Sequence, residues 1–82
     1  IPVYLNQKKA KPNGALLVFG KPIMAKNIFF LSKKSSLLEA ASNLYTLLRK
    51  VKESGYKNIS VSKIPKKGIG KAINDRLQRA SS

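Results

Sequence analysis

Residues 36–54 constrain the fold more than any other stretch, because they form a long amphipathic segment with marked ends. Apolar residues recur at the i, i+4, i+7, i+11 and i+14 spacing that places side chains on one face of an α-helix. The five residues on this face are Leu37, Ala41, Leu44, Leu48 and Val51. Four more apolar residues widen the stripe, namely Leu38, Ala40, Tyr45 and Leu47. A stripe of this width predicts a helix that covers a sheet rather than the narrow seam of a coiled coil.

The ends of this helix are marked by residue types that favour helix termini. Ser36 and Glu39 have the spacing of a capping box, in which each side chain pairs with a backbone N–H left free at the helix start. Gly55 is the residue type that most often adopts the left-handed conformation just after a helix. We therefore expect a helix that begins after Ser36 and ends before Gly55.

Other segments have the patterns of strands and of a second helix. The strands are expected at residues 1–5, 15–19, 27–31 and 58–62, and the second helix at residues 71–80. The order β-β-β-α-β-α predicts a small Rossmann-like α/β domain, of two or three layers, spanning residues 1–82. Residues 27–62 are expected to form a parallel, right-handed crossover. The two earlier connections are short for parallel crossovers, which leaves a mixed sheet as an alternative.

The net charge of the chain is extreme, at +14, because 17 Lys and Arg residues stand against only 3 acidic residues. One interpretation is attraction to nucleic acid or another polyanion. The other is a surface of solvated lysines. Only Arg49, Arg76 and Arg79 carry the bidentate fork that suits phosphate, and the lysine pairs lie in separate segments. These observations favour solvated lysines and leave weak, non-specific nucleic-acid binding as the alternative.

The chain lacks the residue types on which most catalysis and metal binding depend. It has no His and no Cys, which removes thiol nucleophiles, the usual zinc ligands and the commonest general base. Glu39 and Glu53 lie about 21 Å apart along one helix, too far to share a metal ion. We therefore expect neither an active site nor a metal site in this chain. The lack of Cys fits a cytoplasmic location, and no apolar run is long enough for a membrane span.

One local arrangement has the features of an anion site. Gly68 and Gly70 open the second helix, and Lys66, Lys67 and Lys71 surround them. Free N–H groups at a helix start, together with nearby cations, suit a bound anion. The alternative is a tight turn beneath solvated lysines, since glycine is the usual residue in such turns.

Several segments together resemble the C-terminal domain of the two-domain L-threonylcarbamoyladenylate (threonylcarbamoyl-AMP) synthases. The matching segments are Pro2–Asn6, Leu16–Gly20, Leu31–Ser32, Glu39–Tyr45 with Leu48–Arg49, Ile64–Pro65, Gly68–Gly70 and Ala72–Leu77 with Arg79–Ala80. The polar run Asn74-Asp75-Arg76 is the most specific of these motifs, because packing does not require that order. The family usually carries an acidic residue after Leu48-Arg49, where this chain has Lys50-Val51-Lys52.

The resemblance implies an accessory, Rossmann-like domain. Its parent enzyme joins threonine, bicarbonate and ATP into threonylcarbamoyl-AMP, the donor for modification of a tRNA adenosine. ATP with magnesium is then expected in the full enzyme, and no cofactor is expected in this domain. The catalytic N-terminal domain, the expected partner, and the linker are not in this sequence. Residues 65–76 are the predicted interdomain or nucleotide-facing surface, with Lys66, Lys67, Gly68, Gly70, Lys71, Asn74, Asp75 and Arg76 as candidate site residues. The alternative is a stand-alone basic domain that binds nucleic acid.

Overall fold

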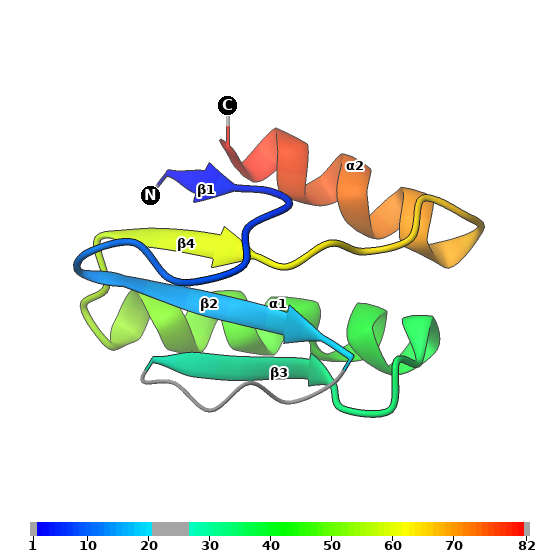
Figure 1. Ribbon diagram of the computed structural model, residues 1–82, viewed down its shortest axis with the longest axis horizontal. Coiled ribbons are helices and arrows are strands. Elements are labelled where there is room, and N and C mark those ends of the chain that lie inside the picture. Colours follow the sequence, from blue (N-terminus) through cyan, green and yellow to red (C-terminus); the bar gives the residue numbers. More distant parts are fainter. Residues whose placement is uncertain (1, 21–26, 82) are drawn as a thin grey trace.

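A four-stranded sheet with two helices makes up the computed structural model, which describes residues 2–20 and 27–81 (Figure 1). The elements are β1 (Val3–Tyr4), β2 (Gly14–Phe19), β3 (Ile28–Ser32), α1 (Leu37–Glu53), β4 (Asn58–Val61) and α2 (Ile69–Ser81). Their order is the predicted one, and their bounds lie close to the predicted bounds. Ile1, which belongs to the first predicted strand, lies outside the described residues.

All neighbouring strands of the sheet are parallel, in the order β1-β4-β2-β3. The alternative of a mixed sheet is therefore wrong. The loop of residues 5–13 explains how a short connection can join two strands that run in the same direction. Gln7 N–H donates to the Val61 carbonyl at 2.9 Å, and Lys57 N–H donates to the Asn13 carbonyl at 2.8 Å. The loop thus runs back along β4 and crosses it in Figure 1, so that β2 starts at the same end of the sheet as β1.

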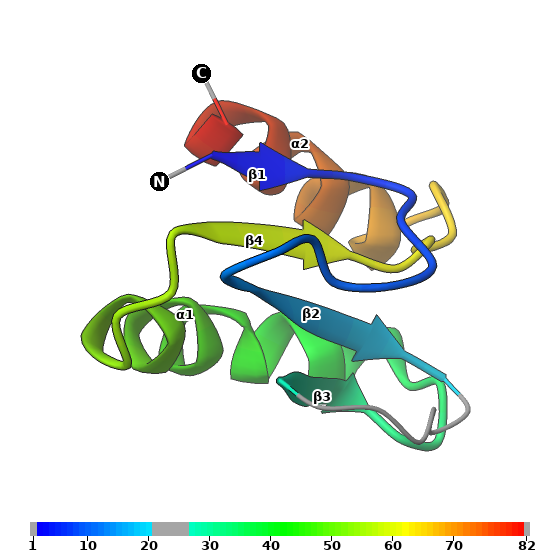
Figure 2. The ribbon, with the colours of Figure 1, turned by 60° about the vertical axis from the view of Figure 1, so that its left-hand side comes forward.

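Both helices lie on one face of the sheet, which gives the domain two layers (Figure 2). The α1 helix packs on β3 and β2, α2 packs beside β1, and the two helices contact each other. The chain passes from β3 through α1 to β4, as expected for a parallel crossover. Strand β2 lies between β3 and β4 and is parallel to both. Neither helix has the length and hydropathy that crossing a lipid bilayer would require.

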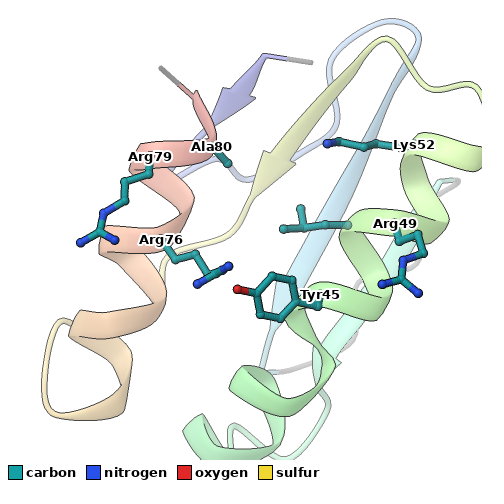
Figure 3. Close-up of a pocket in the computed structure, with 7 residues that line it drawn as sticks. Tyr45, Arg49, Lys52, Arg76, Arg79 and Ala80 are labelled. Carbon is teal, nitrogen blue, oxygen red and sulfur yellow. The ribbon is translucent and has the colours of Figure 1, made fainter.

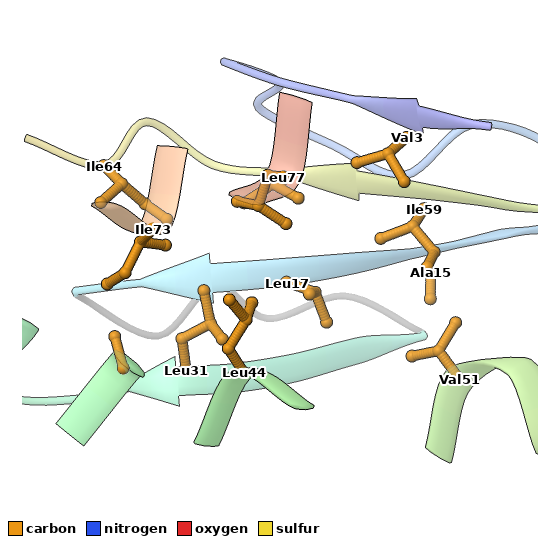
Figure 4. Close-up of a cluster of buried hydrophobic side chains, with 12 residues drawn as sticks. Val3, Ala15, Leu17, Leu31, Leu44, Val51, Ile59, Ile64, Ile73 and Leu77 are labelled. Carbon is orange, nitrogen blue, oxygen red and sulfur yellow. The ribbon is translucent and has the colours of Figure 1, made fainter. Parts of the chain in front are cut away.

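The core fills the space between the sheet and the helices (Figure 4). Its fully buried members include Leu17, Leu31 and Ile59 from the strands and Val51 and Leu77 from the helices. Burying a side chain of this size contributes about 1.5–3 kcal/mol. Residues 15–18 are all buried, which confirms the prediction of a strand covered on both faces. The sheet and the two helices therefore depend on one shared core for their stability.

The start of α1 confirms half of the predicted capping box. The Ser36 hydroxyl accepts a hydrogen bond from the Glu39 N–H at 3.2 Å. The reciprocal bond is not formed, because Ser36 N–H donates to the Ser32 hydroxyl at 2.9 Å instead. The Glu39 carboxylate lies 3.5 Å from the Lys34 ammonium. At the other end, Gly55 has φ 84°, which confirms the left-handed residue after the helix.

Two members of the predicted apolar stripe do not join the core. Leu38 is 70% exposed and Tyr45 is 53% exposed. The sheet contacts one side of α1, whereas Tyr45 lies on the side turned toward α2, where it contacts Arg76. Leu38 precedes Tyr45 by two helical turns and so shares its side of the helix. This part of the stripe is therefore available for binding.

Candidate functional site

The loop that leads into α2 is held by the side chain of Asn74. Its amide nitrogen donates to the Ile64 carbonyl at 3.1 Å and to the Gly70 carbonyl at 2.8 Å. Asn74 is 7% exposed, so these bonds are shielded from water. Gly70 is also buried, and a side chain there would overlap the Pro65 carbonyl oxygen. Asn74 and Gly70, two of the predicted site residues, therefore have a structural role, because they fix the path of the backbone before α2.

Replacing Asn74 by alanine is expected to lower the free energy of unfolding by about 1–3 kcal/mol, because the Ile64 carbonyl loses a donor in a buried setting. Urea denaturation of the chain, followed by circular dichroism, measures the change. Asp75→Ala is the matched control, since Asp75 is an exposed neighbour on the same helix. It should change stability by no more than about 0.5 kcal/mol. Equal effects of the two substitutions would contradict the structural role of Asn74.

The predicted site residues divide between two sides of α2. Lys66, Lys71, Asn74 and Asp75 line one hollow of about 320 Å³, together with Gln78. Arg76 is absent from that lining and points toward α1 instead (Figure 3). The helical repeat explains the division, because positions 71, 74, 75 and 78 share one face and position 76 lies on another. The side chains of the motif Asn74-Asp75-Arg76 therefore lie on two different sides of α2.

The turn before α2 uses part of the hydrogen-bonding capacity that an anion would need. Gly70 N–H donates to the Lys67 carbonyl at 2.9 Å, and Lys71 N–H donates to the Gly68 carbonyl at 3.1 Å. Gly68 has φ 51°, a conformation that suits glycine in such a turn. These contacts favour the interpretation of a tight turn, and anion binding at this position stays a prediction.

A second surface brings together all three arginines of the chain. They line a groove of about 490 Å³ between α1 and α2, which we call the arginine groove (Figure 3). Its lining residues are Tyr45, Leu48, Arg49, Lys52, Arg76, Arg79 and Ala80. The lining contains four cations and no acidic residue. Because arginine stays protonated in proteins, the groove can bind negative charge but offers no general base.

Arg76 is the cation of the arginine groove that contacts an aromatic ring. Its guanidinium carbon lies 3.9 Å from the centroid of the Tyr45 ring, a close cation–π contact. Within residues 2–20 and 27–81, the only ion pair joins Lys34 to Glu39. The arginines of the groove therefore have no carboxylate partner in the described part of the chain, and their N–H donors are available to a ligand.

The residues of the arginine groove lie in two separate segments of the sequence, which does not show that they meet. The sequence pattern places Tyr45 in the apolar stripe. It identifies the three arginines as the cations suited to phosphate and Arg76 as a candidate site residue, but it does not bring them together with Tyr45. A helical signal was present, since Tyr45, Leu48, Arg49 and Lys52 are spaced at i, i+3, i+4 and i+7. That spacing does not reveal that α2 supplies the opposite wall.

The fold and its surfaces define a small parallel α/β domain with hollows lined by basic residues. In the part of the chain that the structure describes, no three His, Cys, Asp or Glu residues gather to hold a metal ion. A family model described as "Threonylcarbamoyl-AMP synthase, C-terminal domain" matches residues 3–82. The chain therefore belongs to the family of threonylcarbamoyl-AMP synthase C-terminal domains, which confirms the resemblance seen in the motifs. Comparisons with curated proteins and with solved structures give no match.

Proposed function

We propose that this chain is the accessory domain of a threonylcarbamoyl-AMP synthase and assists a catalytic domain that it does not contain. The match to the family model over residues 3–82 carries the proposal. The parent enzyme would join threonine, bicarbonate and ATP into threonylcarbamoyl-AMP, the donor for modification of a tRNA adenosine. ATP and its magnesium ion are assigned to the catalytic domain, since this chain has only three acidic residues.

The surface that we assign to docking is the apolar end of the helix pair, which comprises Leu38, Ala41, Ile69 and Ala72. Ile69 is 42% exposed although it is a large hydrophobic residue. Ala41, Ile69 and Ala72 line a small hollow of about 150 Å³ between the two helices. Exposed apolar surface beside a hollow is typical of interaction sites. Ile69 and Ala72 also fall within residues 65–76, the segment predicted from the sequence to face either the catalytic domain or a nucleotide.

Docking at the apolar end can be tested in the full-length enzyme with the double substitution Leu38→Glu and Ile69→Glu. Two carboxylates buried in an apolar interface would be left unpaired, at a high cost in binding free energy. We expect the rate of threonylcarbamoyl-AMP formation to fall by about tenfold, as for loss of an interface hot spot. Limited proteolysis should also cut the linker between the domains more rapidly.

The control for docking is Thr46→Glu, which places a carboxylate at an exposed position of α1 that lines neither the apolar hollow nor the arginine groove. It should leave both measurements unchanged. Circular dichroism of each variant checks that the domain remains folded. A folded double variant with unaltered activity and unaltered proteolysis would overturn the assignment of this surface.

A further inference from the structure

The arginine groove concentrates on one surface the cations best suited to bind phosphate. The chain has fourteen lysines but only three arginines, and all three arginines line this one groove. A guanidinium presents N–H donors in a planar fork that matches two phosphate oxygens, whereas a lysine ammonium acts as a point charge. The groove therefore offers directional phosphate recognition in addition to the positive charge of the wider surface.

The placement of these cations suits a chain of phosphates more than one compact anion. Arg49 and Arg79 come from different helices, and Figure 3 shows them pointing away from each other on the two sides of the groove. Arg76 reaches toward Tyr45 between them, and Lys52 extends across from α1 (Figure 3). A single phosphate could not meet all four side chains at once. Successive phosphates of one strand could meet them in turn.

The groove also has the aromatic component that single-stranded nucleic acid uses. Tyr45 is 53% exposed and lines the groove, as do the apolar residues Leu48 and Ala80. Proteins that bind single strands combine a basic groove with aromatic rings on which bases stack. An acidic protein segment would satisfy the cations but would gain less from the exposed ring. The net charge of +14 adds long-range attraction for a polyanion.

From these observations we infer that the arginine groove binds the backbone of a single-stranded nucleic acid. Arg49, Arg76 and Arg79 contact successive phosphates, and Tyr45 provides the surface for a base. The inference does not rest on docking to the catalytic domain, because none of the four residues that define the apolar end lines the arginine groove. The test below uses this chain alone, so that its failure leaves the docking proposal standing.

The test is the binding of a short fluorescein-labelled oligouridylate to the chain, followed by fluorescence anisotropy across a salt series. The triple substitution Arg49→Gln, Arg76→Gln and Arg79→Gln removes three charges from the groove. We expect it to weaken binding at low salt by about tenfold or more and to reduce the slope of log K against log salt by about 2, at about 0.7 for each phosphate contact on a single strand.

The matched control removes three charges elsewhere, through Lys9→Gln, Lys57→Gln and Lys63→Gln. These lysines are exposed and none of them lines the groove. The control variant has the same net charge as the groove variant, so it should lose only the long-range attraction. We expect its affinity for the oligouridylate to fall by about threefold or less at low salt. Circular dichroism confirms that both variants are folded.

Three results would overturn the inference. The first is no binding of the oligouridylate by the unaltered chain at low salt. The second is equal weakening in the groove variant and in the control variant, which would assign binding to diffuse charge. The third is competition by poly-glutamate that is as strong as competition by unlabelled oligouridylate, which would assign the groove to an acidic protein segment. A greater loss in the groove variant together with weak competition by poly-glutamate supports the inference.

Discussion

Replacing Leu17 by alanine is expected to lower the free energy of unfolding by about 2–5 kcal/mol. Leu17 lies on β2, a central strand of the sheet, and its exposed fraction is 0%. The substitution removes apolar surface from the core and leaves a cavity between β2 and the helices, which the parallel strands on both sides prevent from closing fully. A chain of this length has a total stability of roughly 4–12 kcal/mol, at roughly 0.05–0.15 kcal/mol per residue. The loss therefore removes much of the stability.

The control for this prediction is the same substitution at an exposed leucine. Leu38 is 70% exposed, so Leu38→Ala should change the free energy of unfolding by about 0.5 kcal/mol or less. Chemical denaturation of both variants, followed by circular dichroism, gives the comparison. Similar midpoints for Leu17→Ala and Leu38→Ala would mean that the core does not lie between the sheet and the helices as described.

Replacing Gly70 by alanine is expected to destabilise the domain by about 1–3 kcal/mol, even though alanine is the better helix former. Gly70 is the second residue of α2, and a β-carbon there would overlap the Pro65 carbonyl oxygen and press on Leu37. The overlap involves backbone, which a rotamer change cannot relieve. The loop of residues 62–68 must move, and the hydrogen bond from Asn74 to the Ile64 carbonyl is then disturbed.

Lys71→Ala is the control for Gly70→Ala, because Lys71 is exposed on the next position of the same helix. It should be neutral within about 0.5 kcal/mol. Differential scanning calorimetry of the two variants measures the difference, and a lower melting temperature for Gly70→Ala alone is expected. If Gly70→Ala raised the melting temperature, the close approach of Pro65 to α2 would be refuted.

The two proposed surfaces lie on one pair of helices and differ in chemistry. The four residues of the apolar end, which include Ile69, are all apolar, whereas the arginine groove contains four cations. Tyr45 and Arg76 line both hollows and so mark the boundary between them. Substitutions at Leu38 and Ile69 therefore test docking, and substitutions at Arg49 and Arg79 test nucleic-acid binding, with little overlap between the two experiments.

The sequence by itself determined the elements and their order. The apolar spacing in α1 predicted a helix, Ser36 and Gly55 predicted its ends, and residues 15–19 predicted a buried strand. All three predictions are confirmed. They rest on interactions between residues close together in the chain, such as the bond from Glu39 N–H to Ser36, so local patterns are enough to reveal them.

Only the tertiary structure decided which segments meet. Local pattern left the direction of the first strands open, and the return of the loop of residues 5–13 along β4 makes the sheet parallel. Local pattern also placed Tyr45 in the core and kept Asn74 and Arg76 in one motif. The packing of α2 against α1 exposes Tyr45, buries Asn74 beneath a loop and turns Arg76 toward Tyr45 on α1. The physical reason is that these outcomes depend on contacts between residues far apart in the chain, whose geometry is set when both helices cover the same face of the sheet.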